Sequence, residues 1–390
     1  MLQAVHSIHF PISARNFVMP MVQCLNENGI ATELWLENQP KHAETVRHIT
    51  VPRRFVDSDL SFNPPDLMRR LARYRAALRQ IRPQVLHAHQ TRASLIPLLA
   101  AKLERVPMRV YHNHGLPYLG YRGPLRWLLR SLEKINIGLA THVLLVSHSN
   151  LAAARTDGLL KDGAGEILAN GSAVGIDLRE FAPEHFDEAA QRRAKGKFGI
   201  AHAPFVLAFV GRPVKRKGFH GLLRAWEQSG LGAKANILLA AGCTGDECDR
   251  ALGRHVAGVR GLGYLSSLRE CYAACDAVVL PSDHEGIGYS LLEGAAAERA
   301  LLGCDVPGIR CAILENQTGL LVPARDATAL RRAIERLAAD TALCSRLGQN
   351  ARIRVERDFD RKLVLGALVR FYVSELRMGP DERCACLENN

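Results

Sequence analysis

The sequence predicts an α/β protein with two doubly wound, Rossmann-like domains that face each other across a cleft. Short apolar runs alternate with amphipathic stretches through most of the chain, which is the pattern of parallel sheets covered by helices. The alternation is interrupted once, between Gly171 and Pro204, and then restarts. With 390 residues, the chain is long enough for two domains that each bury a full core. Ligands of such domains bind at the carboxyl ends of the strands.

The first domain is expected over residues 1–180. Apolar runs bounded by turn residues predict its strands at 4–10, 32–36, 47–51, 85–89, 109–114 and 142–147. Amphipathic stretches between them predict helices at 17–28, 65–81, 94–104 and 124–138. The first of these helices is expected to end before Gly29, because glycine commonly follows the last helical turn.

The second domain is expected over residues 205–358, after a linker at 181–204. Its strands are predicted at 205–211, 236–241, 277–281, 301–304 and 320–322. Its helices are predicted at 218–228, 268–274, 289–298, 327–339 and 341–356. A last helix, at about 359–376, is expected to pack back on the first domain, and the polar tail at 379–390 is expected to be flexible.

The charge favours anionic partners. The chain has 51 basic and 39 acidic residues, a net charge of +12. Its densest basic stretch consists of Arg69, Arg70, Arg73, Arg75, Arg79 and Arg82. This stretch is either a solvated helix face or a surface that rests on anionic lipid headgroups. No zinc-finger spacing, RNA-binding aromatic signature or heptad beside a basic region is present, so no nucleic-acid partner is expected.

The sequence indicates a cytoplasmic protein without a resident metal or cofactor. No apolar run approaches the ~20 residues that span a bilayer, and the N-terminus lacks the pattern of a signal peptide. The ten cysteines form no C-x-x-C pair and have no histidine at ligand spacing. Reduced thiols are therefore expected, since a cytosolic protein rarely holds structural disulfides.

A basic loop opens the second domain. An apolar strand ends at Gly211, and Arg212 and Lys217 precede the next helix. Backbone N–H groups at a helix start, together with long cationic side chains, suit a phosphate group. The spacing is not that of a Walker loop. The alternative is a basic turn that simply faces solvent.

The segment 281–293 carries two carboxylates on either side of a glycine-containing turn. Glu285 follows the strand, and Glu293 lies eight positions later, about one turn into the next helix. Unpaired N–H groups of such a turn suit a diphosphate. Carboxylates on either side suit sugar hydroxyls, because charge-assisted hydrogen bonds are short and directional.

This segment resembles the E-x7-E motif of the retaining family-4 glycosyltransferases of the GT-B fold. Arg212 and Lys217 match the same family's arginine and lysine after the first strand of the donor domain. Three further segments agree: 83–89 resembles "P-D-x-V-H-x-H", 111–115 resembles the "H-G" strand end, and 170–181 resembles "G-x-x-x-G-I-D…F". The resemblance runs from about residue 80 to 376, and its closest variants elongate polyprenyl-diphosphate-linked glycans or surface polysaccharides.

The resemblance implies a retaining hexosyltransferase that uses a nucleotide sugar, usually a UDP-sugar, without a metal. Arg212 and Lys217 would neutralise the diphosphate leaving group. Glu293 would bind the ribose, Glu285 the transferred sugar, and His114 would face the donor sugar unless it is only a structural histidine. Phosphate-binding amides would come from Gly286, Ile287, Gly288, Tyr289, Ser290 and Leu291. The base would contact Tyr264 and Leu265, a weaker match.

Three departures from the family pattern lie in regions that the family uses. The stretch 296–303 lacks the usual glycine and proline, with Glu298 and Ala300 in their places, and Cys311 replaces a glutamate. Both changes are expected to lie beside the donor site, where they would alter the sugar preference or weaken activity. The loop 11–15, which contains Arg15, lacks the usual glycine pair of the acceptor side.

The resemblance also implies an acceptor at the inner face of the cell membrane. Aromatic and basic residues gather in one segment of the first domain: Tyr118, Tyr121, Arg122, Arg126 and Trp127. Such a mixture suits a peripheral contact with anionic headgroups. The alternative is an ordinary helix that packs through Trp127 and Leu128. Two other functions stay open: a sugar-nucleotide epimerase or phosphorylase of the same fold, and a degenerate relative that binds a sugar nucleotide without transfer.

Overall fold

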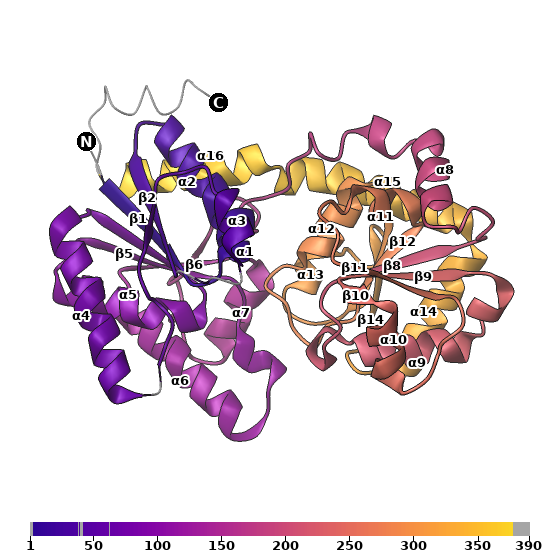
Figure 1. Cartoon of the computed structure of the whole chain (residues 1–390), viewed down its shortest axis with the longest axis horizontal. Helices are drawn as coiled ribbons and strands as arrows, with labels where there is room; N and C mark the ends of the chain where they lie inside the picture. Colours follow the sequence, from indigo (N-terminus) through magenta and orange to yellow (C-terminus); the bar gives the residue numbers. More distant parts are fainter. Residues whose placement is uncertain (1–2, 38, 40–41, 62, 377–390) are drawn as a thin grey trace. The chain divides into compact units, whose positions relative to one another are not determined.

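The computed structural model describes residues 3–37, 39, 42–61 and 63–376, so the tail predicted at 379–390 lies outside the described part. The chain divides into two compact units (Figure 1). Met1–Gly175 and Arg361–Asn390 form the first unit, and Ile176–Asp360 forms the second. The boundary therefore falls after residue 175, and the last helix belongs to the first unit.

The first unit contains a parallel sheet in the order β3-β2-β1-β4-β5-β6-β7. Its strands are β1 (Gln3–Ile8), β2 (Ala31–Leu36), β3 (Arg53–Phe55), β4 (Val85–His89), β5 (Met108–Asn113), β6 (His142–Leu145) and β7 (Glu166–Ile167). Its α-helices are α1 (Pro11–Ser13), α2 (Met19–Glu27), α3 (Ala43–Arg47), α4 (Pro64–Ile81), α5 (Thr91–Leu103), α6 (Gly123–Leu139), α7 (His148–Thr156) and α16 (Arg361–Glu375). A π-helical turn, Ala14–Val18, joins α1 to α2, and a 3₁₀ turn, Pro117–Gly120, precedes α6.

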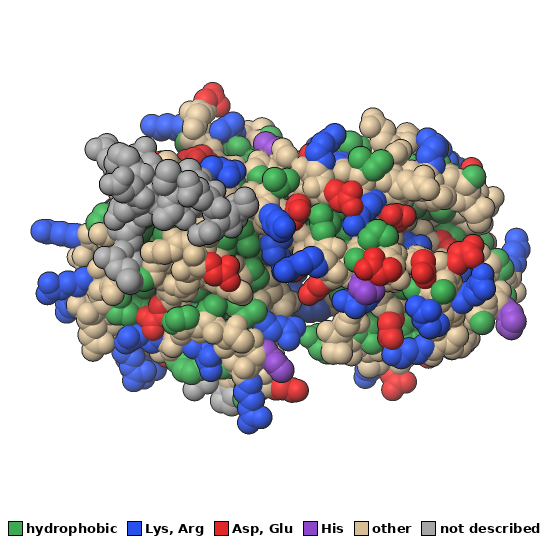
Figure 2. Space-filling view, turned by 90° about the horizontal axis from the view of Figure 1, so that it is seen from above, with side chains coloured by type: hydrophobic (Ala, Val, Ile, Leu, Met, Phe, Trp, Pro, Cys, Tyr) green, Lys and Arg blue, Asp and Glu red, His purple; other side chains and the backbone are tan. Residues whose placement is uncertain are grey.

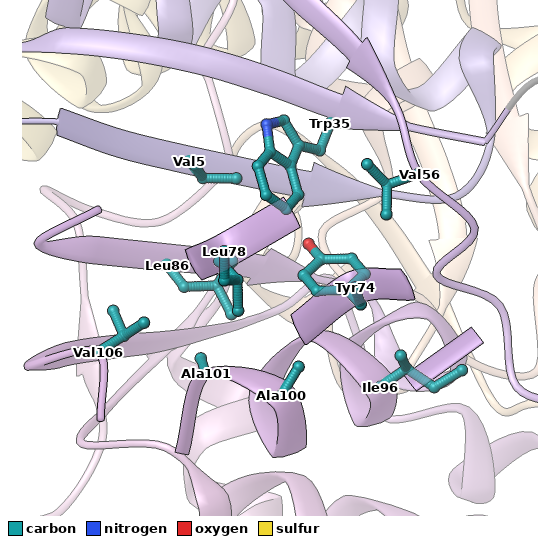
Figure 3. Close-up of a cluster of buried hydrophobic side chains, with 10 residues drawn as sticks. All are labelled: Val5, Trp35, Val56, Tyr74, Leu78, Leu86, Ile96, Ala100, Ala101 and Val106. Atoms are coloured by element: carbon teal, nitrogen blue, oxygen red, sulfur yellow. The ribbon is translucent and has the colours of Figure 1, made fainter. Parts of the chain in front are cut away.

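One buried cluster shows how side-chain alternation divides the two faces of this sheet. Val5 of β1 and Leu86 of β4 pack with Trp35 against Tyr74 and Leu78 of α4 (Figure 3). Because successive residues of a strand point to opposite faces, the neighbours of Val5 and Leu86 point to the opposite face. That opposite face carries the histidines described below.

The second unit has a sheet in the order β10-β11-β9-β8-β12-β13-β14, parallel except for the β10–β11 pair. Its strands are β8 (Val206–Val210), β9 (Ile237–Ala241), β10 (Cys243–Thr244), β11 (Val259–Gly263), β12 (Ala277–Leu280), β13 (Ala300–Cys304) and β14 (Gly319–Val322). Its α-helices are α8 (Glu188–Lys197), α9 (Phe219–Ser229), α10 (Gly245–Leu252), α11 (Arg269–Ala274), α12 (Tyr289–Ala296), α13 (Ile309–Ala312), α14 (Ala327–Ala339) and α15 (Thr341–Phe359). A 3₁₀ turn, Lys215–Lys217, precedes α9.

Two of the predicted elements are wrong. No strand forms at 47–51, because Ile49 and Val51 are buried in a core cluster beside β2 without pairing as a strand, and β3 follows at Arg53–Phe55. The segment 181–204 is not a linker, because it contains α8, whose N-cap residue Asp187 accepts a hydrogen bond from the Ala190 amide. This helix packs against α11 of the second unit.

The surface charges and the cysteines are arranged as the composition predicts, with both charge signs on the surface and thiols that are not paired. On the face shown in Figure 2, basic side chains are interspersed with acidic ones. The eight cysteines in the described part of the chain are free thiols, whereas Cys384 and Cys386 lie outside it. Among the described helices, none combines the length and the apolar character needed to cross a membrane.

Candidate functional site

The second unit has a topological switch point between β8 and β12. The chain runs from β8 to its neighbour β9 on one side, and β12 later pairs with β8 on the other side. Loops that leave adjacent strands at such a point diverge, and the opening between them is where doubly wound sheets bind ligands. The predicted basic loop follows β8, and the predicted glutamate turn follows β12.

Close backbone contacts hold these two loops together. Gly218 has a φ of +71°, and a Cβ there would lie 1.9 Å from the carbonyl oxygen of Pro281. The Asp283 amide donates a hydrogen bond to the Arg216 carbonyl at 3.0 Å. Gly308 approaches from the other side, where a Cβ would lie 2.3 Å from the carbonyl oxygen of Glu285. The absence of side chains at Gly218 and Gly308 therefore allows the loops to meet.

The structure brings Lys217 and Glu285 into direct contact. Lys217 Nζ donates to Glu285 Oε1 at 2.6 Å, and the two side chains are 20% and 12% exposed. Because both side chains are largely shielded from solvent, each charge depends on the other for compensation. Arg212 is exposed at the end of β8 and makes no side-chain ion pair with the residues that the structure describes.

Glu293 is positioned by a residue that the sequence did not point to. It lies on α12, and the Tyr272 hydroxyl donates to its Oε2 at 2.5 Å. Burial, followed by the nearby charge of Glu293, raises the pKa of Tyr272 well above its usual value, so this hydroxyl remains a donor. No spacing signal in the sequence links residues 272 and 293.

The predicted phosphate-binding turn precedes α12, which has Gly288 at its N-cap with a φ of +64°. Ile287 and Leu291 are buried, whereas Gly286, Tyr289 and Ser290 are partly exposed. Tyr264 follows β11 at the same edge of the sheet and is 75% exposed, as a stacking partner for a base would be, and Leu265 is partly exposed beside it.

The departure at Glu298–Ala300 does not lie beside this site. Helix α12 runs from the carboxyl edge of the sheet to its amino edge, and Ala300 opens β13 there. Glu298 occupies the turn with a φ of +59°, a conformation that favours glycine. This expectation is therefore wrong, and the change affects the backbone of a remote turn. Cys311 lies on α13, the helix that begins directly after Gly308, whose backbone approaches Glu285.

In the first unit, His114 directly follows β5, and its Nε2 lies 3.0 Å from His89 Nδ1. Burial lowers the pKa of His114 to about 4, so the imidazole is neutral at physiological pH. The predicted alternative, a hydrogen-bonded histidine, is compatible with a functional role, because its second ring nitrogen makes no hydrogen bond with other described residues. Arg15 lies in the π-helical turn, where its Nε donates to Asn16.

The predicted membrane-side residues separate into a core member and an exposed group. Tyr118 is fully buried beneath the Arg126 guanidinium, so its assignment to the acceptor or membrane side is wrong. Trp127 is 70% exposed and Leu128 is also exposed, so the alternative of a helix packed through these residues is wrong as well. Helix α6 packs instead through its buried residues Leu132, Glu133 and Asn136. Tyr121 and Arg122 are exposed before α6.

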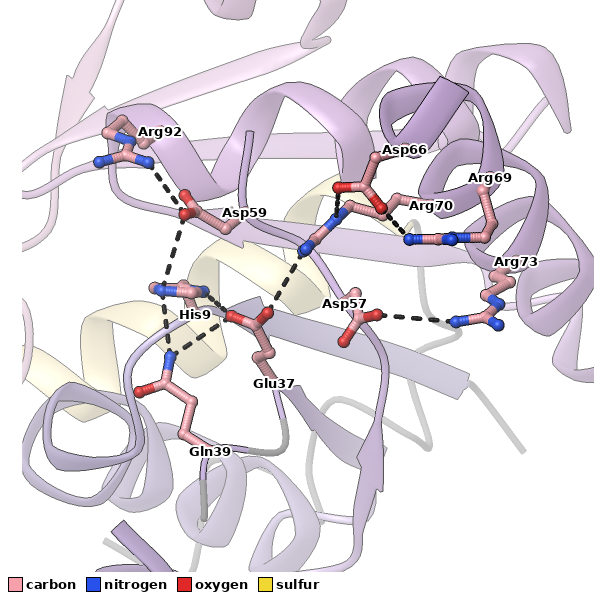
Figure 4. Close-up of polar contacts among 10 residues, drawn as sticks. All are labelled: His9, Glu37, Gln39, Asp57, Asp59, Asp66, Arg69, Arg70, Arg73 and Arg92. Atoms are coloured by element: carbon pink, nitrogen blue, oxygen red, sulfur yellow. Dashed lines mark hydrogen bonds and ion pairs between the residues drawn. The ribbon is translucent and has the colours of Figure 1, made fainter. Parts of the chain in front are cut away.

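The basic stretch of α4 is not a free cationic patch. Arg70 pairs with Glu37 and Asp66, and Arg73 lies 3.9 Å from Asp57 (Figure 4). Arg75 and Arg79 both donate hydrogen bonds to Glu104, the residue that directly follows α5. In the same network His9 contacts Glu37 and lies 3.8 Å from Asp59. The structure thus favours the interpretation of a solvated, ion-paired helix face.

Comparisons with known proteins agree with this geometry. Residues 14–171 match the glycosyl transferase 4-like domain, and residues 190–354 match glycosyl transferases group 1. The capsular polysaccharide biosynthesis glycosyltransferase CapM of Staphylococcus aureus is 27% identical over 301 residues, which are 76% of this chain and 78% of CapM. The N,N'-diacetylbacillosaminyl-diphospho-undecaprenol alpha-1,3-N-acetylgalactosaminyltransferase of Campylobacter jejuni is 24% identical over 371 residues, which are 93% and 96% of the two chains.

The fold is shared with solved glycosyltransferase structures. HepE of Anabaena, solved in complex with UDP and glucose, has a TM-score of 0.78 at 16% identity, over 96% of this chain and 100% of that chain. Together, the two domain matches and these relatives show that the chain belongs to the family-4 glycosyltransferases of the GT-B fold. The predicted family and fold class are therefore confirmed.

Proposed function

We propose that this glycosyltransferase moves a hexose, with retention and without a metal, from a UDP-sugar to a glycan carried on a polyprenyl diphosphate. The observation that carries the proposal is the Lys217–Glu285 pair, 2.6 Å apart at the switch point of the second unit. Two comparisons support it. HepE was solved with UDP and glucose, and the Campylobacter relative is named for an undecaprenol-diphosphate-linked acceptor.

In the proposed reaction the cations act on the leaving group. As the bond between the sugar and the diphosphate breaks, negative charge grows on the diphosphate oxygens, and Lys217 and exposed Arg212 stabilise it. Such cations take the role that a metal has in other transferases, and this is why no metal is invoked. The acceptor hydroxyl then forms the new glycosidic bond on the face that the leaving group vacates and passes its proton to an oxygen of the departing diphosphate, so the configuration is retained.

The carboxylates select and orient the donor. Glu285 accepts hydrogen bonds from the sugar hydroxyls once Lys217 turns to the phosphate, and Glu293 accepts from the ribose hydroxyls while Tyr272 holds it in place. On the acceptor side, exposed Trp127 and Leu128 of α6, with Arg122 nearby, would rest on the inner face of the cell membrane. That contact would keep the enzyme beside a lipid-linked acceptor.

Thermal stability against UDP, GDP, dTDP, ADP and their sugar conjugates tests the donor, with and without magnesium. A ligand at about 100 times its dissociation constant should stabilise the protein by ~2.7 kcal/mol. We expect one uridine ligand to do so in both conditions, and Lys217→Ala to lose the response. Lys215→Ala is the matched control, because Lys215 is exposed on the same turn and does not contact Glu285. No response to any nucleotide would contradict the proposal.

Product analysis separates the alternatives. A sugar-nucleotide epimerase would convert the donor with no acceptor present, and a phosphorylase would require inorganic phosphate. A degenerate relative would bind the nucleotide without turnover on any lipid-linked acceptor. The structure weakens one reason for the last alternative, because the altered turn at Glu298 lies at the amino edge of the sheet and not beside Glu285.

A further inference from the structure

Five histidines of the first unit form one hydrogen-bonded chain. They are His6 of β1, His87 and His89 of β4, His112 of β5, and His114 directly after β5. In the strand register His6 pairs with His87, and His89 pairs with His112, so these side chains lie on one face of the sheet. The first four are fully buried.

The contacts run in a single line. The line begins at His114, whose Nε2 lies 3.0 Å from His89 Nδ1. His89 Nε2 in turn lies 3.0 Å from His6 Nδ1. The Tyr372 hydroxyl of α16 lies 3.0 Å from both His6 Nε2 and His87 Nδ1.

The last link is His87 Nε2, which lies 3.1 Å from His112 Nδ1. At the far end, His112 Nε2 is buried and has no hydrogen-bond partner in the described part of the chain. The chain therefore begins at His114, passes through a phenol from the C-terminal helix, and ends at a buried nitrogen.

The arrangement couples the tautomers of all its members. Burial lowers the pKa of His6 to about 3 and that of the other histidines below the usual value, so each ring is neutral. A neutral imidazole has one N–H and one lone pair, and the Tyr372 hydroxyl also donates only once. All five hydrogen bonds must therefore point in the same direction along the chain.

The buried end selects the direction. If the bonds pointed away from His114, His112 Nε2 would carry a buried N–H without an acceptor, which is the rarer kind of orphan group in proteins. If they point toward His114, His112 keeps only an unused lone pair there. The second arrangement places the proton of every ring on Nδ1, including that of His114.

We propose that Tyr372 and the buried histidines are positioning residues that fix His114 as the tautomer with its N–H on Nδ1. The N–H at the free end of the chain then donates a hydrogen bond to an oxygen of a ligand at the carboxyl edge of this sheet. That this ligand is a substrate of sugar transfer rests on the proposed function, whereas the tautomer does not. The C-terminal helix thus sets the hydrogen-bonding character of a site residue through Tyr372.

A metal is the competing explanation for such a cluster. The triads His6–His87–His89 and His89–His112–His114 each have ligand atoms within 4.8 Å of one another. The linear chain is favoured because its links, at 3.0–3.1 Å, have the length of direct hydrogen bonds and use all but one nitrogen of its buried members.

Nitrogen-15 NMR of the full chain, labelled at histidine and free of ligand, tests the tautomer without an activity assay. We expect the His114 signals to show a protonated Nδ1 and an unprotonated Nε2. Tyr372→Phe removes the central link and should give His114 a mixture of tautomers. Tyr74→Phe is the matched control, because Tyr74 is equally buried but lies against the opposite face of the sheet.

A His114 proton on Nε2 in the wild-type spectrum would overturn the proposal, as would unchanged His114 signals in Tyr372→Phe. Zinc retained at one ion per chain, with histidine signals that change on chelation, would establish the metal explanation instead. In a transfer assay, Tyr372→Phe should lower kcat about tenfold, the scale of a lost orienting hydrogen bond, while Tyr74→Phe leaves it unchanged. If no transfer is found at all, the proposed function fails, and the wild-type spectrum still decides the tautomer.

Discussion

The two units build their sites in opposite ways. In the second unit, the Lys217–Glu285 pair lies on loops that leave β8 and β12, and backbone contacts at Gly218 and Gly308 hold those loops together. In the first unit, the histidines lie on the strands themselves and are buried. Charged groups on loops can exchange a partner for a ligand, whereas neutral groups on a buried sheet face hold one hydrogen-bond pattern. Under the proposed function, the second unit therefore binds charge and the first orients a single polar group.

Removing the carboxylate of the loop pair should have the largest effect. Glu285→Ala is expected to lower kcat for sugar transfer by a hundredfold or more, the scale of a lost transition-state hydrogen bond. Asp283→Ala is the control, because Asp283 lies two residues away and pairs with Arg325 rather than Lys217. The measurement is release of the nucleotide with a lipid-linked acceptor. Full activity in Glu285→Ala would show that the loop pair is not the donor site.

The second largest effect is expected from acid pH, which should lower the stability of the first unit more than that of the second. The histidines have pKa values below 6.5 in the folded state, so unfolding takes up protons at lower pH. Their contribution to stability is complete above about pH 6.5 and is lost as the pH falls toward 4, at ~1.4 kcal/mol per pH unit for each proton taken up. Hydrogen exchange of the two units at pH 7 and 5 measures this. We expect the first unit to lose protection first, and equal loss in both would contradict the assignment.

A buried carboxyl in the first unit acts in the other direction. Glu133 accepts hydrogen bonds from Thr91, Tyr111 and Asn113, and burial raises its pKa to about 7. The folded state then favours the protonated form, so stability falls as the pH rises from about 4.5 to 7. Glu133→Gln should remove this loss, so the free energy of unfolding of the variant minus that of the wild type should rise between pH 4.5 and 7. A difference between the two proteins that stays constant over this range would assign the loss to another group.

Substitution of an exposed residue in the proposed membrane contact should have a smaller effect. Trp127→Ser removes the aromatic side chain of α6 and should lower binding to vesicles that contain anionic lipid at least tenfold, because ~1.5–3 kcal/mol of apolar transfer is lost. Ile353→Ser is the control, since Ile353 is similarly exposed but lies on α15 of the second unit. Cosedimentation measures both. Equal binding by wild type and Trp127→Ser would exclude α6 as the contact.

The smallest effect is expected at the remote turn. Glu298→Gly relieves a left-handed backbone conformation and should raise the free energy of unfolding by about 1 kcal/mol. Because the turn lies at the amino edge of the sheet, kcat should stay the same. Urea denaturation and the transfer assay check the two parts. A changed kcat would show that this departure from the family pattern does affect the donor site.

Much of the proposed donor site could be predicted from the sequence. Its charged residues lie in local strand–turn–helix segments: Arg212, Lys217, Glu285 and Glu293. In such segments the spacing of charged residues and glycines determines where each side chain lies. Strands with continuous apolar runs, such as β8 and β12, could be predicted equally well. Predictions failed where an apolar residue is buried without a strand, as at Ile49, or where a helix lies in a polar stretch, as α8 does.

The sequence by itself determined the two-unit α/β architecture, the family, and the loops that carry opposite charges. Tertiary structure alone decided which residues meet across long separations. Tyr272 reaches Glu293, and Tyr372 joins His6 to His87 over more than half the length of the chain. It also buried Tyr118 and exposed Trp127. The physical reason is that periodicity and spacing act over a few residues, whereas these contacts depend on how sheets and helices pack.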